Sequence, residues 1–461
     1  MCIWGLGKVI FMFNRQLFIL AHEMGDLSFY LTYQHLIKNQ WKSCADLRVE
    51  QEKLLRHMIQ YCNDNVPFYH TLFKNLGIKA DTIKTVEDLQ KLPVLTKETI
   101  KENWEAFKPV PLSGIKYHSA TTGGSTGVPL TYRVSKFDRF LSGALLYRGW
   151  GYCGYELGDK MVILGGSSLD VGSKTKMITF IHETARNFKK LSSLDLGEKE
   201  MRNYAEVLNA FQPKFIRGYA SSIYFYAQWL EKNSVVVPSP HAVFTTADKL
   251  YPHMRETIGR VFECEVFDGY GLNDGGISAY ECPEHCGLHI DTERSVMEVV
   301  DPKGHQIENG EGRILATSLH NYAMPFIRYD TGDLGSITDR QCSCGRQSPL
   351  IENIIGREKE FLIAPNGQRV YGADLIFLIF VESKMPEIGN KIKEFQIIQS
   401  EPRIITILLV CDEVLPDFAL DNMRAALQKR YNGWEIEFQF VDAIDRTRAG
   451  KYKFIINEIG K

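Results

Sequence analysis

Short runs of β-branched and aromatic residues alternate with helix-like segments between about residues 115 and 355. The runs are KMVILGG, KFIRGY, HAVFTTA and CEVFDGY, and the helix-like segments include EKEMRNYAEVLNAF and YPHMRETIGRVF. Strands that alternate with helices in this way pair in parallel through helical crossovers. The pattern therefore predicts an α/β domain with parallel strands.

The two ends of the chain follow other patterns. Apolar residues recur at helical spacing over residues 47–61, and the segments near residues 70 and 95 resemble helix starts, so we expect mainly helices across residues 15–110. Beyond Gly356, strand-like EFQIIQS, PRIITILLVC and EIEFQFV accompany helix-like DNMRAALQKRY, which indicates a separate unit. We therefore expect a large α/β domain over residues 1–355, with a helical part to about 110 and an α/β core over 111–355, and a small, mobile α+β domain over 356–461.

The overall charge argues against two classes of partner. A net charge of -2 on 461 residues gives no global attraction for nucleic acid or for an anionic membrane. The N-terminal segment is apolar, but Lys8, Arg15 and Glu23 interrupt it before any run reaches the ~18–20 apolar residues that a bilayer needs, which favours a packed or peripheral helix over a membrane anchor. The ten cysteines do not suggest a disulfide scaffold, so the cytoplasm is the expected location.

A glycine-rich segment gives the strongest local signal for a ligand. Residues 119–130 read SATTGGSTGVPL, with three glycines among threonines and serines. Glycines let backbone N–H groups approach phosphate oxygens, and the hydroxyls add further donors. The segment lacks the Gly-Lys-Ser/Thr ending of a Walker loop, which argues against a kinase or GTPase. A glycine-rich surface turn is the alternative.

Two later segments are compatible with a nucleotide site. FDGYGLND, over residues 267–274, offers an aromatic ring for a purine and a carboxylate for Mg²⁺, although a turn with a buried tyrosine has the same pattern. RYDTGD, over residues 328–333, ends in a carboxylate that can accept hydrogen bonds from ribose hydroxyls. Arg357 follows and offers a cation for ribose or phosphate.

Four of the cysteines form two close pairs. CPEHCGLH spans residues 282–289 and CSCGR spans residues 342–346. Four soft ligands in two pairs suit a closed tetrahedral Zn²⁺ site. The candidate ligands are Cys282, Cys286, Cys342 and Cys344, with His289 as a possible replacement for Cys286. Unrelated buried thiols and a zinc-ribbon module for nucleic acid are the alternatives, and the near-neutral charge argues against the second.

Taken together, the order and spacing of these segments resemble the adenylate-forming (ANL) ligase superfamily, in its branch of phenylacetate-CoA ligases and CapK-type proteins of capsular polysaccharide biosynthesis. The resemblance runs from about residue 40 to the end of the chain. It rests on NDNVPFYHTLF and DLQKLPVLTKETIKEN near the start, TTGGSTGVP for the phosphate loop, TTADKL and YGLND for the adenine and magnesium region, YDTGD for the ribose segment, GREKE for the hinge and DRTRAGK for a C-terminal Gly-Lys loop. Cysteines flanking similar segments occur in this branch.

The resemblance implies a role for each matching residue. The residues that it implies around the β and γ phosphates are Thr122, Gly123, Gly124, Ser125, Thr126 and Gly127. Those implied beside the adenine are Ala247, Asp248, Tyr270 and Gly271. The remaining implied roles are ribose binding by Asp333, nucleotide contact by Arg357, Mg²⁺ binding by Asp274 and catalysis by Lys451.

Lys451 is the implied link between the two reacting groups. Attack of a carboxylate on an α-phosphate brings two anions together, and a lysine supplies a compact cation for the charge that develops. Without the resemblance, Lys451 reads as an ordinary solvated lysine near the C-terminus.

Two departures from the family pattern affect these expectations. Asn273-Asp274 stands where the family usually has Thr-Glu, so Mg²⁺ binding is expected with altered geometry. The hinge lacks the common pair of aspartates, and its pivot is expected near Glu358 or Lys359.

The resemblance implies an ATP-dependent, AMP-forming acid-thiol ligase that activates an aryl or similar carboxylic acid and transfers the acyl group to coenzyme A. A CapK-like enzyme that attaches the acid to an amine or hydroxyl in surface polysaccharide assembly is an alternative. A nucleotide-binding relative without catalysis is another, suggested by Asn273-Asp274. Segments such as 164–169 and 216–222 are expected to line the acid pocket, but no spacing rule identifies the acid. The sequence does not indicate the oligomeric state.

Overall fold

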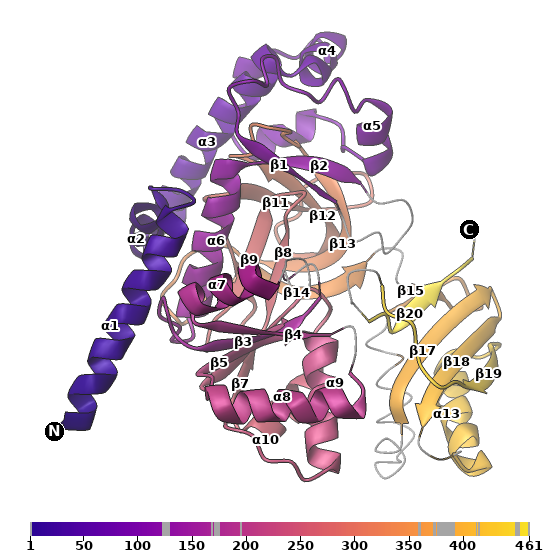
Figure 1. The fold of residues 1–461 in the computed structure, drawn as a ribbon. Helices are drawn as coiled ribbons and strands as arrows, with labels where there is room; N and C mark the ends of the chain where they lie inside the picture. Colours follow the sequence, from indigo (N-terminus) through magenta and orange to yellow (C-terminus); the bar gives the residue numbers. More distant parts are fainter. Residues whose placement is uncertain are drawn as a thin grey trace.

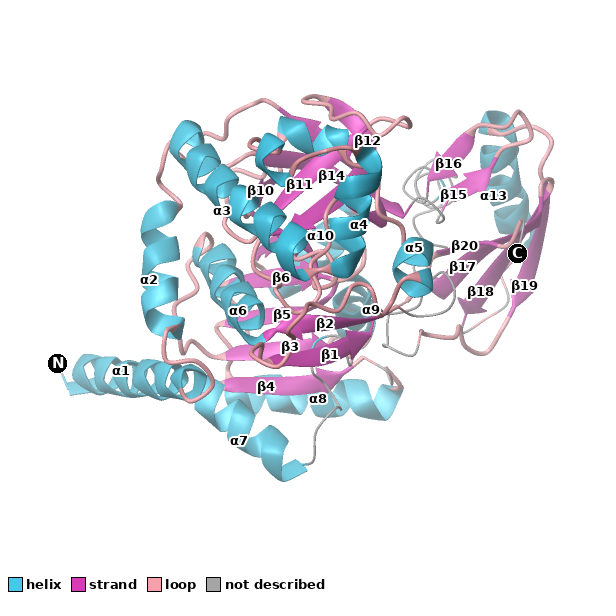
Figure 2. Ribbon diagram, turned by 90° about the horizontal axis from the view of Figure 1, so that it is seen from above, coloured by secondary structure: helices cyan, strands magenta, loops and turns pink. Residues whose placement is uncertain are grey.

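The computed structural model describes residues 2–121, 130–166, 169, 176–193, 196–357, 361–371, 375, 392–411, 413, 415–447 and 452–459. For residues 2–11, 176, 369 and 371 it describes the backbone alone. A large domain and a small C-terminal domain lie side by side (Figure 1). Seen from above, helix α1 extends from one side of the large domain, and the small domain lies at the opposite side (Figure 2). Within the described ranges, no helix combines the length and apolar character needed to cross a membrane.

The N-terminal part of the chain is helical, as predicted. Its α-helices are α1 (Cys2–Glu23), α2 (Phe29–Asn39), α3 (Cys44–Asn65), α4 (Pro67–Leu76) and α5 (Lys97–Glu102). Ser43 and Thr96 cap α3 and α5 by accepting hydrogen bonds from backbone N–H groups in the first turn, and α4 begins at a proline, which lacks the N–H that a helix start leaves unpaired.

Parallel strands form the first sheet of the large domain. These strands are β3 (Met161–Gly165), β4 (Phe188–Ser192), β5 (Phe215–Tyr219), β6 (Ala242–Thr246) and β7 (Glu265–Phe267), in the order β4-β3-β5-β6-β7. Every pairing in this sheet is parallel. The crossover helices are α7 (Lys176–Arg186), α8 (Glu198–Phe211), α9 (Ala220–Lys232) and α10 (Pro252–Phe262). This arrangement confirms the α/β expectation for the segment.

Alternate residues of the central strands face opposite layers. Val162 and Leu164 belong to the core that includes buried residues of α8, α9 and α10, on the lower side of the sheet in Figure 1. Ile163 and Phe215 belong to the core that includes α6 (Lys136–Gly151), on the upper side. Because strand side chains alternate between faces, a strand buried on both faces is apolar throughout.

The second sheet is antiparallel, which corrects the expectation of parallel strands up to residue 355. Its strands are β8 (Gly269–Leu272), β9 (Ile277–Glu281), β10 (Leu288–Ile290), β11 (Ser295–Val300), β12 (Gly310–Ser318), β13 (Tyr329–Thr338) and β14 (Leu350–Arg357), in the order β11-β12-β13-β14-β10-β9-β8. The connections between these strands are too short to hold a crossover helix, so neighbours pair antiparallel. Strand β14 ends at Arg357, two residues beyond the predicted domain boundary.

In the described part of the small domain, a four-stranded sheet packs against helix α13 and lies beside a two-stranded hairpin. Strands β17 (Ile392–Glu401), β18 (Ile404–Cys411), β19 (Glu435–Phe440) and β20 (Ile455–Asn457) form a mixed sheet in the order β19-β18-β17-β20, and β15 (Phe361–Ile363) pairs with β16 (Arg369–Tyr371). Buried residues of helix α13 (Asp417–Arg430) pack against the sheet. The fully buried Trp434 donates from Nε1 to the carbonyl of Ile363, 3.1 Å away, and so ties the sheet to the hairpin.

Aromatic rings join the small domain to the large one. Phe225 of α9 meets Tyr452 edge-on, with ring centroids 5.0 Å apart, and Tyr251 meets Phe454 at 5.7 Å. All four side chains are buried. The two domains therefore share one hydrophobic core at this aromatic seam, defined by these four rings.

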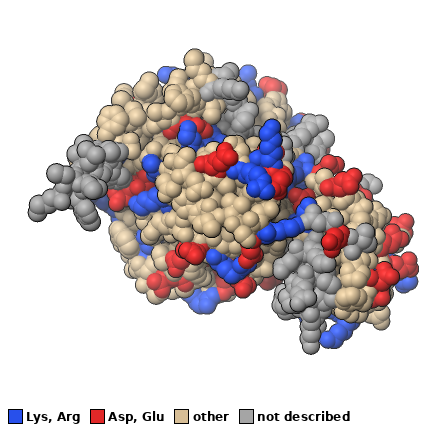
Figure 3. Space-filling view, turned by 60° about the horizontal axis from the view of Figure 1, so that its bottom comes forward, with Lys and Arg blue, Asp and Glu red and all other residues tan. Residues whose placement is uncertain are grey.

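On the face shown in Figure 3, acidic and basic side chains lie interspersed around the large domain. This agrees with the low net charge of the chain.

Buried His22 holds α1 against α6. Its Nδ1 lies 2.8 Å from the carbonyl of Phe18 and its Nε2 lies 3.0 Å from the hydroxyl of Tyr147, an arrangement that suits a neutral ring donating from Nδ1 and accepting at Nε2. Burial, together with the nearby Arg186, lowers the pKa of His22 from 6.5 to about 4.

We expect His22 to make the folded state sensitive to acid. Below pH 6.5 the histidine of the unfolded chain takes up a proton while that of the folded protein does not. The contribution of neutral His22 to the free energy of unfolding is therefore complete above pH 6.5 and is lost as the pH falls towards 4. Urea unfolding at pH 7 and at pH 4.5 measures this loss. Between the two pH values, the free energy of unfolding should fall by roughly 2–3 kcal/mol less in His22→Gln than in the wild type. His305→Gln, at an exposed histidine, is the control, and equal losses in all three proteins would contradict the prediction.

Candidate functional site

A cavity of about 770 Å³ opens where the two sheets of the large domain meet the small domain. The carboxyl end of β6, strand β8 and parts of β13 and β14 line it from the large domain. Thr447 and residues 452–455 line it from the small domain. In an α/β domain, ligands commonly bind beyond the carboxyl ends of parallel strands, which is where this cavity lies.

All the described residues with a predicted nucleotide role line this one cavity. They are Ala247, Asp248, Tyr270, Gly271, Asp274, Asp333 and Arg357. They come from four separate parts of the sequence, and the fold brings these parts together around one cavity.

The other residues with a predicted role at the phosphates or in catalysis lie outside the described ranges. These are Thr122, Gly123, Gly124, Ser125, Thr126, Gly127 and Lys451. Their described neighbours do line the cavity: Thr121, at the end of β1 (Tyr117–Thr121), and Thr447 and Tyr452 on the two sides of Lys451. Thr121 pairs with Thr131 of β2 (Thr131–Ser135), so both ends of the glycine-rich segment leave the same hairpin.

The carboxylate of Asp333 connects three strands within the cavity. Tyr270 donates a hydrogen bond from its hydroxyl to Oδ2 at 2.8 Å, and Arg357 Nε lies 3.4 Å from Oδ1. Asp333 and Arg357 are also register partners on β13 and β14. Burial, reinforced by the charge of Asp333, raises the pKa of Tyr270 well above 10, so its hydroxyl remains a hydrogen-bond donor at neutral pH.

Asp274 is positioned by a residue that the sequence did not point out. The hydroxyl of buried Tyr329 donates to Asp274 Oδ2 at 2.8 Å, and burial followed by the charge of Asp274 raises the pKa of Tyr329. Asp274 is 6% exposed and faces the cavity. One carboxylate oxygen is thus oriented by the protein, which suits a carboxylate that binds a hard cation.

Asp248 has a structural contact in addition to its place in the cavity wall. Its carboxylate accepts hydrogen bonds from the backbone N–H groups of Ala220 (2.7 Å) and Ser221 (3.2 Å) and from the Ser221 hydroxyl. These groups belong to the first turn of α9, where N–H groups have no partner within the helix. Ala247, beside it, has φ of 74°, a left-handed conformation that turns the chain at the end of β6.

Asp268 is a second carboxylate in the cavity wall, and its side chain is half-buried. It accepts hydrogen bonds from the Thr245 hydroxyl at 2.7 Å and from the Gly269 N–H at 2.9 Å. Burial raises its pKa from 3.8 to about 6. Neighbouring Glu281 is bound by Arg255 at 3.0 Å. Sequence analysis did not identify Asp268, although it lies inside the FDGYGLND segment.

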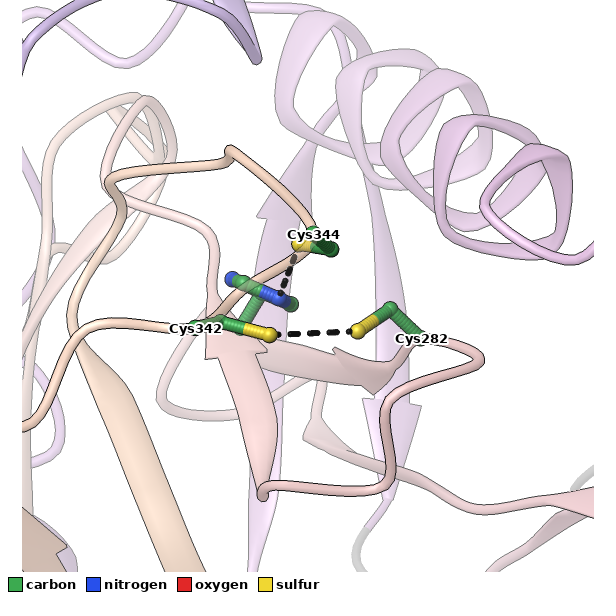
Figure 4. Close-up of side chains that lie close together, drawn as sticks. Cys282, Cys342 and Cys344 are labelled. Atoms are coloured by element: carbon green, nitrogen blue, oxygen red, sulfur yellow. Dashed lines mark hydrogen bonds between the residues drawn. The ribbon is translucent and has the colours of Figure 1, made fainter.

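Three cysteines and one histidine form a second cluster, and none of the four lines the cavity. The ligand atoms of Cys282, His289, Cys342 and Cys344 all lie within 4.8 Å of one another. Figure 4 shows the three thiols around the imidazole, with the sulfurs of Cys282 and Cys342 3.5 Å apart and that of Cys344 3.3 Å from His289 Nε2. His289 Nδ1 lies 3.1 Å from the Ser348 hydroxyl, which leaves Nε2 facing the sulfurs.

The grouping corrects the first choice of four cysteines. Cys286 is exposed, and its sulfur lies 3.3 Å from the carbonyl of Glu284 instead of joining the cluster. The physical reason is the pairing of β10 with β14, which turns His289 inwards beside Leu350 while Cys286 remains in the preceding turn. The alternative with His289 in place of Cys286 is the one that the structure brings together.

Several cations of the cavity were not singled out from the sequence, and Arg217 is one of them. Arg217 of β5 lines the cavity together with Trp150 and Tyr280. It falls within the segment 216–222 that was expected to line an acid pocket, and Leu169 of the other expected segment also lines the cavity. The available signal was an arginine inside the otherwise apolar run KFIRGY, because arginine is rarely buried without a reason.

Comparison with known proteins gives consistent results. The family model of the CapK C-terminal domain matches residues 370–458. Protein CapK of Staphylococcus aureus is 26% identical and the match covers 91% of each chain. The phenylacetate-coenzyme A ligase of Thermus thermophilus is 24% identical, covering 76% of this chain and 78% of the relative.

Solved structures of one ligase share the fold. 2-Hydroxyisobutyryl-CoA ligase in the postadenylation state superposes with a TM-score of 0.72, at 19% identity and 91% coverage of both chains. The same ligase in the thioesterification state superposes with a TM-score of 0.59, again covering 91% of both chains.

We expect the carboxylate of Asp248 to contribute measurably to stability. Asp248→Ala should lower the free energy of unfolding by about 1–3 kcal/mol, because the first turn of α9 loses its acceptors inside the protein. Thermal and urea unfolding measure the loss. Asp421→Ala removes an exposed carboxylate and should change stability by about 0.5 kcal/mol or less. A similar small change in both variants would contradict the assignment.

Proposed function

Because the chain belongs to the adenylate-forming ligases, in the branch of CapK and the phenylacetate-CoA ligases, we propose that it is an ATP-dependent, AMP-forming acid-thiol ligase. It converts a carboxylic acid and ATP into an acyl-adenylate and pyrophosphate, and then transfers the acyl group to coenzyme A. The observation that carries this proposal is the single cavity lined by seven residues with expected nucleotide roles.

The first half-reaction forms a mixed anhydride. A carboxylate oxygen of the acid attacks the α-phosphorus of ATP, the bond to the bridging oxygen breaks, and pyrophosphate leaves with both electrons of that bond. Asp333 and Arg357 bind the ribose side of the nucleotide, and Tyr270 lies beside the adenine. Lys451 supplies the cation between the two reacting anions. Its nearest described neighbours, Thr447 and Tyr452, line the cavity, which supports this role.

Asp274 is the residue that would hold Mg²⁺ with the phosphates. Its carboxylate lines the cavity and is oriented by Tyr329, and carboxylates are the usual protein ligands of this ion. The ion would neutralise part of the phosphate charge.

The second half-reaction requires a thiolate to reach the acyl carbon. The sulfur of coenzyme A attacks that carbon, and AMP leaves with its phosphate oxygen. We propose that the small domain rotates between the two steps and carries Lys451 away, a gating movement of the lid type. The better superposition on the postadenylation state, at a TM-score of 0.72 against 0.59, supports an arrangement that belongs to the first step.

A second acceptor is favoured by a specific observation. The family model that matches the small domain is that of CapK, and the match to CapK of Staphylococcus aureus spans 91% of both chains. The acyl group would then go to an amine or hydroxyl in surface polysaccharide assembly. Adenylation is common to both candidates, and the acceptor alone separates them.

We expect acid-dependent exchange between ATP and pyrophosphate with the wild type. Lys451→Ala should reduce the exchange by at least ~100-fold while ATP binding, followed by calorimetry, largely survives. Lys429→Ala, on the exposed face of α13, should leave both unchanged. AMP and thioester formation that depends on coenzyme A would select the first acceptor over the second.

Two outcomes would count against the proposal. ATP binding without exchange for any acid in a broad panel would point to a nucleotide-binding relative that has lost catalysis. Unchanged exchange in Lys451→Ala would remove the lysine from its assigned role.

We further propose that Cys282, His289, Cys342 and Cys344 hold a structural Zn²⁺. Three thiols and one imidazole within 4.8 Å of one another fit the compact tetrahedral set that zinc prefers. The contact of His289 Nδ1 with Ser348 supports the fit, because a hydrogen bond at one ring nitrogen orients the other towards a metal. The ion would join β10 to the segment between β13 and β14.

Two matched variants test the metal site. His289→Ala should lose most of the zinc found by elemental analysis of the purified protein and should unfold at lower temperature. Cys286→Ala, which removes a thiol outside the cluster, should keep one zinc per chain. Retention of the metal by His289→Ala, or its loss from Cys286→Ala alone, would refute this ligand set.

A further inference from the structure

Arg217 lines the cavity as a cation for which the described residues provide no counter-ion. It is the third residue of β5, and its guanidinium carbon lies 4.9 Å from the centre of the Trp150 ring. Among the described residues, no carboxylate forms an ion pair or hydrogen bond with it. Burial lowers the pKa of Arg217 below its usual range, and the ionisable groups that act on it are Tyr280, Tyr147 and Tyr219.

The contact with Trp150 does not offset this burial. A cation over an aromatic ring contributes about 0.5–2 kcal/mol. Partial removal of a guanidinium from water costs several kcal/mol unless an anion accompanies it. A strand of apolar residues gains nothing from an unpaired arginine at this position, so a ligand that supplies the missing anion is the simplest physical reason for it.

The carboxylates that line the cavity are bound by other groups. Those groups are Tyr270 and Arg357 for Asp333, Tyr329 for Asp274, the start of α9 for Asp248, Thr245 for Asp268, Arg255 for Glu281 and Arg340 for Glu352. Arg186 lines the cavity as a further cation and acts on the pKa of Tyr147, as Arg217 does. Among the described residues, this end of the cavity therefore presents positive charge without matching negative charge.

Arg217 lies deeper in the sheet than the residues assigned to the nucleotide. Its register partner on β6 is Phe244, whereas the expected nucleotide contacts begin at Ala247, beyond the end of that strand. A strand rises about 3.3 Å per residue, so the two levels are roughly 10 Å apart along the chain. The walls here are aromatic: Trp150 and Tyr147 from α6, and Tyr280 from β9.

The packing around this end is close. A Cβ atom added at Gly149 of α6 would lie 2.3 Å from the Tyr280 ring, so α6 and β9 approach each other at a glycine. Helix α6, strand β9 and the parallel sheet thus supply the described residues around Arg217, which lines the cavity. A substrate bound in this cavity is the group that we expect to reach it.

We propose that the acid that this protein activates carries a second carboxylate, at the end remote from the reacting one, and that Arg217 binds it. This inference rests on the proposed ligase function. The planar guanidinium can bind a carboxylate through two parallel N–H···O bonds, which fixes both the position and the orientation of the substrate. The reacting carboxylate is thereby held at the opposite end, towards the nucleotide.

Matched pairs of acids test the proposal. We expect the wild type to prefer dicarboxylic acids over monocarboxylic acids of the same length and ring content, such as adipate over hexanoate and carboxyphenylacetate over phenylacetate, in kcat/KM for pyrophosphate release. Arg217→Met should lower kcat/KM for the best diacid by roughly 30-fold or more, because a buried charge loses its partner, and should leave the matched monoacid within about threefold. Arg260→Met removes an exposed cation and is the control for net charge.

A measurement of diacid binding tests the role of Arg217 independently of the ligase activity. Calorimetry with the same diacids, in the presence of a nonhydrolysable ATP analogue, should show binding to the wild type and to Arg260→Met and a large loss in Arg217→Met, whether or not adenylation follows. Binding without any pyrophosphate release would overturn the ligase activity and keep the acid site.

Three results would overturn the inference. In the first, Arg217→Met lowers kcat/KM equally for diacids and monoacids. In the second, the variant binds ATP more weakly and shows no change in selectivity among acids. In the third, the wild type binds monoacids as tightly as diacids. Thermal unfolding completes the test. Arg217→Met should melt at the same or a higher temperature, because an unpaired charge has been removed, whereas a purely structural arginine would give a lower one.

Discussion

The carboxylate of Asp333 holds the site together. Tyr270 reaches it from β8, and Arg357 faces it across the pairing of β13 with β14. A pair of charges partly withdrawn from water is stable only when backbone structure fixes both partners, and here the sheet does so. The cavity walls follow from this arrangement, because the strand that carries Tyr270 continues through the turn that carries Asp274, and the strand that carries Asp333 begins at Tyr329, which orients Asp274.

The sequence predicted the fold where short-range patterns are sufficient. Apolar runs separated by helices indicated the parallel sheet, and the change of pattern beyond Gly356 indicated the small domain. The antiparallel sheet was not anticipated, because its strands are also apolar and periodicity does not report direction. Only the short connections between these strands indicated that neighbouring strands run in opposite directions.

The candidate site was predictable to a similar degree. Motifs identified residues such as Tyr270 and Asp333, because each lies within a contiguous stretch resembling a family segment. They could not choose between Cys286 and His289, since that choice depends on the pairing of β10 with β14. Arg217 was missed for the same reason, because the lack of a counter-ion among the described residues is a property of the assembled cavity and of no single segment.

The aromatic seam between the domains has an energetic consequence. Any rotation of the small domain must separate Tyr452 from Phe225 and Phe454 from Tyr251, and it exposes their faces to water at about 25 cal/mol per Å² of apolar surface. Each parted pair also forfeits about 0.5–1.5 kcal/mol of ring–ring attraction. Rotation of the small domain away from the large one therefore costs free energy. We expect the binding, reaction or release of a ligand in the cavity to supply it, and so to set when the rotation occurs.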